Sequence, residues 1–146
     1  MNDYLKDLNI VDLVSEKHQQ LRTKVLKLWI ENGEEDINQT ESHMLAMIEI
    51  KSMTIAETAR RINMSRQAAH KCAQNLISRG YIIANNIEGN QRDKLIMITE
   101  KGKNYCSNML ILKEEIENEI EKNIGKENLN KLRKCLKEKW IDDLEK

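Results

Sequence analysis

The sequence predicts a mainly α-helical fold that includes one small β-hairpin. Proline is absent and glycine occurs only five times in 146 residues, which favours long uninterrupted helices. Apolar residues recur at three- and four-residue steps through most of the chain, and β-prone runs occur only between about residues 81 and 98. This length suits one compact domain, or one domain with extended arms.

The composition argues against several classes of protein. No apolar run reaches the length of about eighteen residues that a membrane span needs, and Asp3, Lys6 and Asp7 interrupt any signal peptide, so we expect a cytoplasmic protein. The chain has no glycine-rich phosphate loop, no His-x-x-x-His pair and no nucleophile motif. We therefore expect neither an enzyme nor a bound cofactor or metal ion. The three cysteines form no Cys-x-x-Cys pair, and we interpret them as reduced, buried thiols.

A long amphipathic helix is predicted between about residues 3 and 31. Its apolar stripe advances by three- and four-residue steps and consists of Leu8, Val11, Val14, His18, Leu21, Val25 and Leu28. Because His18 lies on this stripe, we expect it to be packed or to lie at an interface rather than to bind a ligand. The polar residues 33–38 are expected to form an acidic loop.

Two shorter helices are predicted next. One begins at Thr40 and runs to about residue 50, and the other begins at Thr54, whose spacing to Glu57 matches a capping box. Only a short turn at Asn63 and Met64 separates the second of these from a further helix. Two helices joined by so short a turn must cross at a steep angle, as in a helix-turn-helix.

Residues 65–80 have the features of a helix that inserts into a nucleic-acid groove. Ser65 can cap the first turn, and Gly80 can adopt the left-handed conformation that follows many helix ends. The inward stripe is small and apolar and consists of Ala69, Cys72, Ala73, Leu76 and Ile77. The outward face contains no acidic residue and consists of Gln67, His70, Lys71, Gln74 and Ser78. Such side chains on the first turns of a helix meet base edges and phosphates in the DNA major groove.

The net charge is zero, but the charge is distributed unevenly. Between residues 51 and 103 there are ten Lys or Arg and four Asp or Glu, a local charge of +6, so the remainder carries −6. A basic middle between acidic flanks favours binding to a polyanion, because neutralisation of phosphates provides most of the non-specific affinity.

A β-hairpin is predicted after this helix. The β-prone residues 81–84 and 95–98 are separated by the turn-forming residues Asn85, Asn86, Glu88, Gly89 and Asn90. Arg92 and Lys94 lie on the returning strand. A basic hairpin beside a helix-turn-helix forms a wing that can reach the DNA backbone or minor groove.

Two terminal helices are predicted after Thr99, which can cap the first of them. Their seams are too long for one winged core to cover, so we expect a two-fold homodimer in which the first and last helices intertwine. We predict a dimerisation region at residues 1–32 and 104–146 and a winged helix-turn-helix at residues 40–103, within a single intertwined domain. The dimer contacts are predicted at Leu8, Val11, Leu112, Ile116, Ile120, Leu132, Leu136 and Trp140.

Three short motifs add a family resemblance. They are Ser65-Arg66-Gln67, then Leu76 followed by Arg79-Gly80-Tyr81-Ile82, and Ile98-Thr99-Glu100-Lys101-Gly102. With these motifs, residues 54–102 resemble the winged helix-turn-helix of the MarR family of bacterial transcription regulators, and the order of elements extends the resemblance to nearly the whole chain. In the wing, Asn90 replaces the family's usual aspartate, whereas Arg92 matches its arginine. The resemblance implies a bacterial dimer on a palindromic operator, often released by a small phenolic or cationic ligand or by cysteine oxidation.

These observations predict a sequence-specific, double-stranded DNA-binding transcription regulator. The predicted DNA contacts are Arg60, Arg61, Ser65, Arg66, Gln67, His70, Lys71, Gln74, Arg92 and Lys94. A candidate ligand pocket consists of Trp29, Met44, Met47 and Met109, for which ordinary core packing is the simpler interpretation. The alternative function is a winged-helix protein-interaction module, and the lack of acids on the outer face of residues 65–80 argues against it. Repression and activation both stay open.

Overall fold

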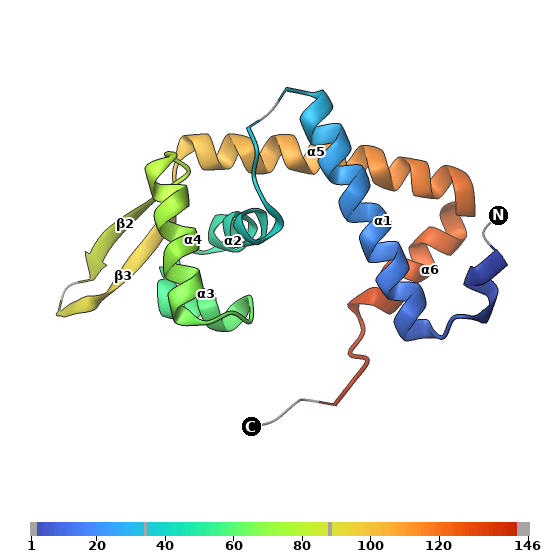
Figure 1. Ribbon diagram of the computed structural model, residues 1–146, viewed down its shortest axis with the longest axis horizontal. Coiled ribbons are helices and arrows are strands. Elements are labelled where there is room, and N and C mark those ends of the chain that lie inside the picture. The colour runs from blue at the N-terminus through green and yellow to red at the C-terminus, as the bar shows by residue number, and fades with distance from the viewer. Residues whose placement is uncertain (1–2, 34, 88, 143–146) are drawn as a thin grey trace. The chain divides into compact units, whose positions relative to one another are not determined.

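The structure, a computed structural model, describes residues 3–33, 35–87 and 89–142 (Figure 1). The elements follow in the order η1 (Asp3–Asp7), α1 (Ile10–Glu31), α2 (Gln39–Ile50), β1 (Met53–Thr54), α3 (Ile55–Arg61), α4 (Arg66–Ser78), β2 (Ile82–Ile87), β3 (Asn90–Ile98), α5 (Glu100–Ile124) and α6 (Lys126–Lys137). The mainly helical fold with a β-hairpin is confirmed. No helix in the described ranges is both long and apolar enough to cross a membrane.

The chain divides into two compact units. The winged unit is Trp29–Leu110, and the arm unit consists of Met1–Leu28 and Ile111–Lys146. The division falls inside α1 and inside α5. Residues 29–32 and 104–110, which were expected in the dimerisation region, are therefore part of the winged unit.

The winged unit contains a three-stranded antiparallel sheet in the order β1-β3-β2. β2 and β3 form the predicted hairpin and extend it to Ile87 and Asn90, which face each other next to the tip. β1 was not predicted, and its Met53 pairs with Ile96 of β3. A strand of two residues has no alternation of its own to detect, because only its partner defines it.

The core of the winged unit is formed by side chains from α2, α4, β2 and β3. Its most deeply buried large apolar side chains are Met44, Leu45, Ile48, Leu76, Ile82 and Ile96. α2 begins at Gln39 rather than at Thr40 because Asn38 is its N-cap. The Asn38 side chain accepts a hydrogen bond from the Glu41 N–H at 2.8 Å, and the Glu41 carboxylate accepts one from the Asn38 N–H at 3.1 Å. This reciprocal pair is a complete capping box.

A tight turn joins α3 to α4, and the two helices run in clearly different directions (Figure 1). Asn63 has a φ of 56°, in the left-handed region that asparagine and glycine tolerate best. The Met64 N–H donates to the Ala59 carbonyl at 3.0 Å, which closes the end of α3. The chain can therefore start α4 at once, as the predicted helix-turn-helix requires.

Close backbone contact joins the start of α5 to the start of the hairpin. A Cβ added to Gly102 would lie 2.4 Å from the Tyr81 carbonyl oxygen and 2.5 Å from Ile98 Cγ1. The Thr99 hydroxyl accepts from the Gly102 N–H at 3.1 Å, so Thr99 caps α5 as predicted, and it lies 2.6 Å from the Gly80 carbonyl oxygen. This contact explains why the Ile98–Gly102 motif ends in glycine.

The arm unit begins with two helical segments rather than with one continuous helix. η1 ends at Asp7 and α1 starts at Ile10, so the prediction of a single helix over residues 3–31 is wrong at this point. The break lies at Asn9, whose Oδ1 accepts a hydrogen bond from the Asp12 N–H at 2.9 Å. Asparagine competes for backbone donors in this way and is favoured at helix starts.

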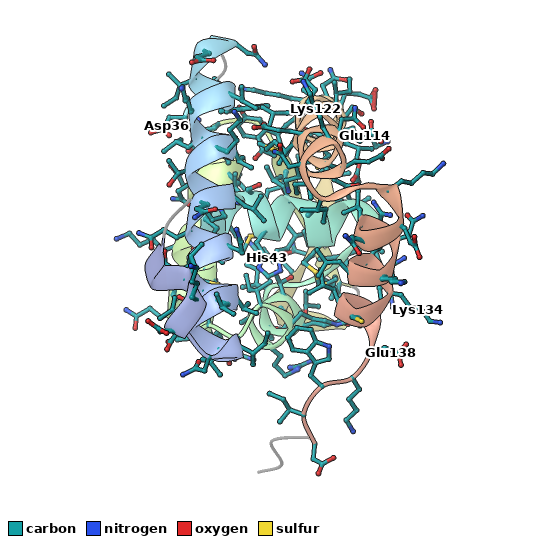
Figure 2. All side chains as sticks on the ribbon, turned by 90° about the vertical axis from the view of Figure 1, so that its right-hand side faces the viewer. Asp36, His43, Glu114, Lys122, Lys134 and Glu138 are labelled. Atoms are coloured by element: carbon teal, nitrogen blue, oxygen red, sulfur yellow. The ribbon has the colours of Figure 1, made fainter. Side chains whose placement is uncertain are left out.

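Ion pairs connect the helices of the arm unit to one another. Lys24 of α1 lies 3.3 Å from Glu119 of α5, and Arg133 of α6 lies 2.6 Å from Glu117 of α5. Further charged side chains lie exposed on the outer surfaces of α5 and α6, where Figure 2 labels Glu114, Lys122 and Lys134. Exposed pairs of this kind contribute little to stability, so apolar packing must hold the arm unit together.

The apolar seams of the arm unit are only partly covered within one chain. Leu112 and Ile116, two of the predicted dimer contacts, are only 2% and 6% exposed within a single chain, which buries them without a partner. Leu132 and Leu136, by contrast, are 44% and 57% exposed. The other exposed large apolar side chains of this unit are Ile10, Val11, Val14, Leu21, Leu26, Ile111, Ile124, Trp140 and Ile141. The predicted contacts Leu8 and Ile120 are half-buried.

The last helix is shorter than its apolar seam suggested. α6 ends at Lys137, so Trp140 lies beyond it, and the Trp140 indole donates to the Cys135 carbonyl at 2.6 Å. Cys135 is exposed, so the expectation of three buried thiols is wrong for this residue. Cys72 and Cys106 are half-buried.

Candidate nucleic-acid interface

α4 presents a fixed polar face to solvent. Ser65 caps it, since the Ser65 hydroxyl accepts a hydrogen bond from the Ala68 N–H at 3.0 Å, and Gly80 follows its end with a φ of 86°. The inward stripe is covered as predicted: Ala69, Ala73 and Leu76 are buried, and Cys72 and Ile77 are half-buried. The predicted reading residues Arg66, Gln67, His70, Lys71 and Gln74 are all exposed. The helix from Arg66 to Ser78 contains no acidic residue.

α3 packs against α4. Ala56 of α3 and Ala69 of α4 are both buried, and such small side chains allow the two helices to approach closely. Thr54 caps α3 by accepting from the Glu57 N–H at 3.1 Å. At the other end of α3, Arg60 and Arg61 are exposed, and Arg61 lies 3.8 Å from the Glu57 carboxylate. Of the two arginines predicted to contact DNA, Arg60 is therefore less neutralised than Arg61.

Of the two basic residues predicted on the wing, Lys94 and Arg92, the structure describes the side chain of Lys94 only. Lys94 is exposed on β3 and, among the described residues, forms no ion pair. Arg92 lies within β3, but its side chain falls outside the described residues, and so do Glu88 and the side chains of Asn90 and Gln91. Arg92 therefore stays a predicted contact.

The acidic charge is not carried by the terminal arms, in contrast to the expectation of a basic middle between acidic ends. Residues 31–49 contain six Asp or Glu and no Lys or Arg, which accounts for the whole charge of −6 outside residues 51–103. The arm unit contains fourteen residues of each sign and the winged unit ten. The charge separation is therefore internal to the winged unit.

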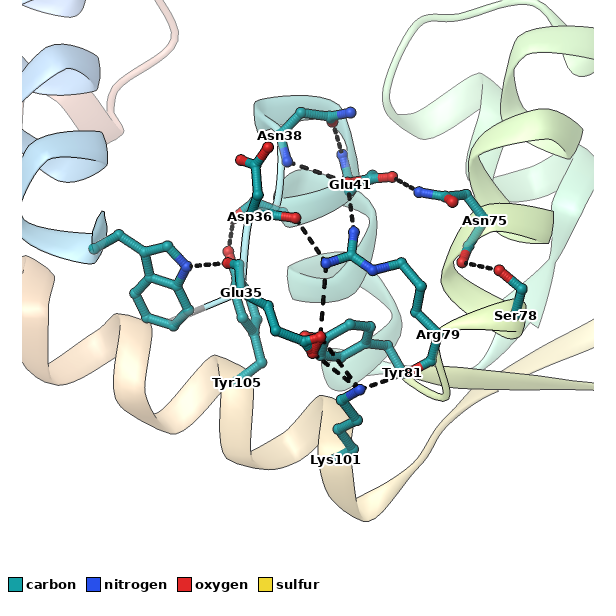
Figure 3. Close-up of polar contacts among 12 residues, drawn as sticks. Glu35, Asp36, Asn38, Glu41, Asn75, Ser78, Arg79, Tyr81, Lys101 and Tyr105 are labelled. Atoms are coloured by element: carbon teal, nitrogen blue, oxygen red, sulfur yellow. Dashed lines mark hydrogen bonds and ion pairs between the residues drawn. The ribbon is translucent and has the colours of Figure 1, made fainter. Parts of the chain in front are cut away.

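Part of the basic charge of the winged unit is paired with this acidic segment (Figure 3). Arg79 lies 3.8 Å from Glu35 and 3.6 Å from Glu41, and it donates to the Asp36 carbonyl at 2.7 Å. Lys101 lies 3.0 Å from Glu35 and 4.5 Å from the centre of the Tyr81 ring. Arg79 and Lys101 therefore hold the acidic loop against α4 and α5, and little of their charge is free for DNA. Neither acid was singled out in the sequence.

This cluster changes the proton affinity of two of its members. The hydrogen bond from the Tyr81 hydroxyl at 2.7 Å, and then the Lys101 ammonium, hold the pKa of Glu35 below its usual value. Burial, followed by that same hydrogen bond, raises the pKa of Tyr81. Glu35 therefore stays ionised and Tyr81 stays protonated at neutral pH, as the hydrogen bond requires.

The four residues of the candidate ligand pocket contribute to the core of the winged unit. Trp29, Met44 and Met109 are buried and Met47 is half-buried. The Trp29 indole donates to the Glu35 carbonyl at 2.6 Å, and its ring meets the Tyr105 ring edge-on at 5.0 Å. His18 is exposed on α1, and the described residues contain no group of His, Cys, Asp and Glu that could hold a metal ion. The ligand pocket stays a prediction.

Comparison with proteins of known structure identifies the fold. The reduced form of MarR from E. coli matches with a TM-score of 0.77 at 18% identity, over 89% of this chain and 95% of that chain. A MarR transcriptional regulator from Methanosarcina mazei Go1 matches with a TM-score of 0.74 at 16% identity, over 87% and 90%. MepR, a transcription regulator of the Staphylococcus aureus multidrug efflux pump MepA, matches with a TM-score of 0.70 at 17% identity, over 88% and 94%.

Sequence comparison alone finds no such relative, since no protein-family model and no curated protein matches the chain. The match is therefore one of three-dimensional arrangement, and it extends from the terminal helices through the wing. Of the three, the proteins from Methanosarcina mazei Go1 and Staphylococcus aureus are described as regulators of transcription. The chain has the fold of the MarR family of transcriptional regulators.

Proposed function

We propose that this protein is a sequence-specific regulator of transcription that binds double-stranded DNA through α4 and the wing. The exposed face of α4 carries the proposal, because it offers hydrogen-bond donors and acceptors and contains no acidic residue. Gln67 in the first turn can pair with an adenine edge, and His70 and Lys71 can reach a neighbouring base or phosphate. With this function and the family resemblance, we expect a cytoplasmic protein of a bacterial cell.

We propose that the protein acts as a homodimer on an inverted repeat. The seams of the arm unit leave Leu132 and Leu136 about half exposed, and large apolar side chains left in this way favour association. The arm unit has equal numbers of acidic and basic residues, so net charge does not oppose the approach of a second copy. Two-fold symmetry then predicts half-sites about one helical turn apart.

The experiment begins by selecting a preferred duplex from a random library with the wild-type protein. Affinities are then measured for that duplex and a scrambled one across a salt series. Gln67→Ala should cost about 1–3 kcal/mol on the preferred duplex and little on the scrambled one, with an unchanged salt slope. Lys94→Ala should weaken binding to both duplexes and reduce the slope by about one for each phosphate that is no longer neutralised.

Gln20→Ala serves as the matched control, since Gln20 is an exposed glutamine of the arm unit. It should change neither affinity. Equal losses for Gln67→Ala on the two duplexes would contradict the assignment of α4 as the reading helix. A wild-type protein that selects no duplex at all would instead favour the alternative function, a winged-helix module that binds another protein. Release by a small ligand stays a prediction from the family resemblance.

A further inference from the structure

Glu41 is a buried carboxylate that links the start of α2 to the C-terminal end of α4. Its side chain is 6% exposed. One oxygen accepts from the Asn38 N–H at 3.1 Å and lies 3.6 Å from Arg79. The other oxygen accepts a hydrogen bond from the Asn75 side-chain amide (Figure 3). A buried charge is stable only when it is paired and hydrogen-bonded, and each oxygen of Glu41 meets that condition.

Glu41 holds Asn75 and Arg79, which lie toward the C-terminal end of α4. Asn75 lies in the last turns of α4, and Arg79 is its C-cap. The proposed reading residues, beginning at Gln67, lie in the first turns. Eight residues separate Gln67 from Asn75, which corresponds to about 12 Å along the helix axis. A tilt of about 10° at the held end would therefore move the first turn by about 2 Å.

A displacement of that size matters for base readout. Hydrogen bonds between side chains and base edges need donor–acceptor distances of about 2.7–3.2 Å and near-linear angles, so a shift of about 2 Å breaks them. Contacts to phosphates are more tolerant, because they depend on charge over several ångströms. Loosening the end of α4 should therefore reduce discrimination between sequences more than it reduces overall affinity.

We propose that Glu41 is a positioning residue that sets the direction of α4 and thereby the discrimination between DNA sequences. This inference rests on the proposed function of α4. Glu41 acts through Asn75 and Arg79 and does not itself touch DNA. Glu35, which also lies near Arg79, holds Lys101 and Tyr81 instead of the helix side chain Asn75.

Three variants test the role of Glu41. Glu41→Gln retains an oxygen that can accept from Asn38 but removes the charge that pairs with Arg79, and its link to Asn75 survives only if the Asn75 amide turns over. Asn75→Ala removes the same link and leaves the capping box of α2 and the contact with Arg79 in place. The double variant Glu41→Gln with Asn75→Asp reverses the polarity of the bond. The amide introduced at position 41 then donates to the carboxylate introduced at position 75, which also returns a negative charge to the vicinity of Arg79.

The readout is the ratio of affinities for the selected and the scrambled duplex, together with the melting temperature of each variant. Glu41→Gln and Asn75→Ala should lower that ratio about tenfold or more and change the affinity for the scrambled duplex less than threefold. The double variant should recover most of the ratio. Glu35→Gln is the matched control and should leave the ratio within about twofold of the wild type.

The outcomes separate this inference from the proposed function. If the wild-type protein discriminates between duplexes and the folded variant Asn75→Ala does so equally well, the positioning role is wrong and the proposed function stands. If melting temperatures fall while the ratio is unchanged, Glu41 is only structural. If the double variant fails to recover the ratio, the link through Asn75 is wrong. A wild-type protein without sequence preference overturns both proposals.

Discussion

The two units of the chain use the same kind of apolar pattern with different results. In the winged unit most large apolar side chains close into a core, which includes the most deeply buried ones among the described residues, such as Met44, Leu76 and Ile96, while Ile30, Ile50, Ile83 and Leu110 stay exposed. In the arm unit the seams of α1, α5 and α6 leave large side chains such as Val11 and Leu136 in water. An isolated chain therefore has one unit with a closed apolar core and one unit whose apolar seams stay open to water.

The difference matches the different roles that we propose for the two units. A reading helix must have a single orientation, and the winged unit provides it with caps, a buried stripe and ionic contacts at α4. The arm unit needs only to offer a continuous apolar surface, and a second copy can complete it. Stability of the first unit should be independent of protein concentration, and that of the second should not be.

The largest effect is expected from charges placed on the open seam. Leu132→Lys combined with Leu136→Lys should convert the proposed dimer to a monomer, because each burial would be removed twice in a two-fold dimer, a total loss of several kcal/mol. Sedimentation over a range of concentrations measures the change. Ile83→Lys is the control, since Ile83 is an apolar residue of the winged unit that is 46% exposed, close to the 44% of Leu132, and its change should leave the dimer intact.

A wild-type protein that sediments as a well-folded monomer at high concentration would contradict the proposal that a second copy covers the seams of the arm unit. Ile116→Lys would not test association alone. Ile116 is already buried within one chain, so a lysine there should unfold the arm unit as well as separate the subunits.

A glycine in each unit tests how closely that unit is packed. Gly102→Ala should destabilise the winged unit by about 3 kcal/mol or more, because the new methyl group meets the Tyr81 carbonyl and the backbone must shift. Gly125→Ala in the arm unit meets no atom within 4 Å, so it should cost only the backbone strain of its φ of 93° and ψ of 152°, about 1–3 kcal/mol, and less than Gly102→Ala. Urea unfolding measures both. Equal losses would show that Tyr81 and α5 separate easily.

The cysteines should differ in reactivity in the same way. Burial, and to a smaller extent Glu41, raise the pKa of Cys72 in α4 to about 11, so its thiolate fraction at neutral pH is roughly a hundredfold below that of an unperturbed thiol. Alkylation of the native protein followed by mass mapping should label the exposed Cys135 first and Cys72 last. Labelling in urea, where burial is abolished, is the control. Rapid native labelling of Cys72 would mean that α4 detaches from the core.

Much of the winged unit could be predicted because its signals are local. The Ser65 cap, the polar face of α4 and the β-prone runs of the hairpin each depend on residues close together in sequence. The capping box at Asn38 and Glu41 has the same kind of signal, and it was missed because Thr40 offered a competing start. β1 and the contacts of Glu35 with Lys101 depend on partners far away in the chain, so no local pattern could reveal them.

The arm unit shows a different limit. Leu112 and Leu136 belong to seams with the same period, yet one is buried within the chain and the other is not. Periodicity identifies the apolar face of a helix, but it does not say whether the covering partner belongs to the same chain. The break at Asn9 was likewise hidden, because Leu8 continues the apolar stripe through it.

The smallest effect concerns the turn that fixes the angle between α3 and α4. Asn63 has a positive φ, so Asn63→Ala should cost about 1 kcal/mol, whereas Asn63→Gly relieves the backbone and should stay within about 0.5 kcal/mol of the wild type. Asn118→Ala is the control, since Asn118 is an exposed asparagine inside α5 and its replacement by alanine should be neutral or slightly stabilising. Urea unfolding resolves the three variants. If Asn63→Ala matched Asn118→Ala, the turn would not constrain the helices, and the orientation of α4 would depend on its contacts at the opposite end, with Glu41 foremost among them.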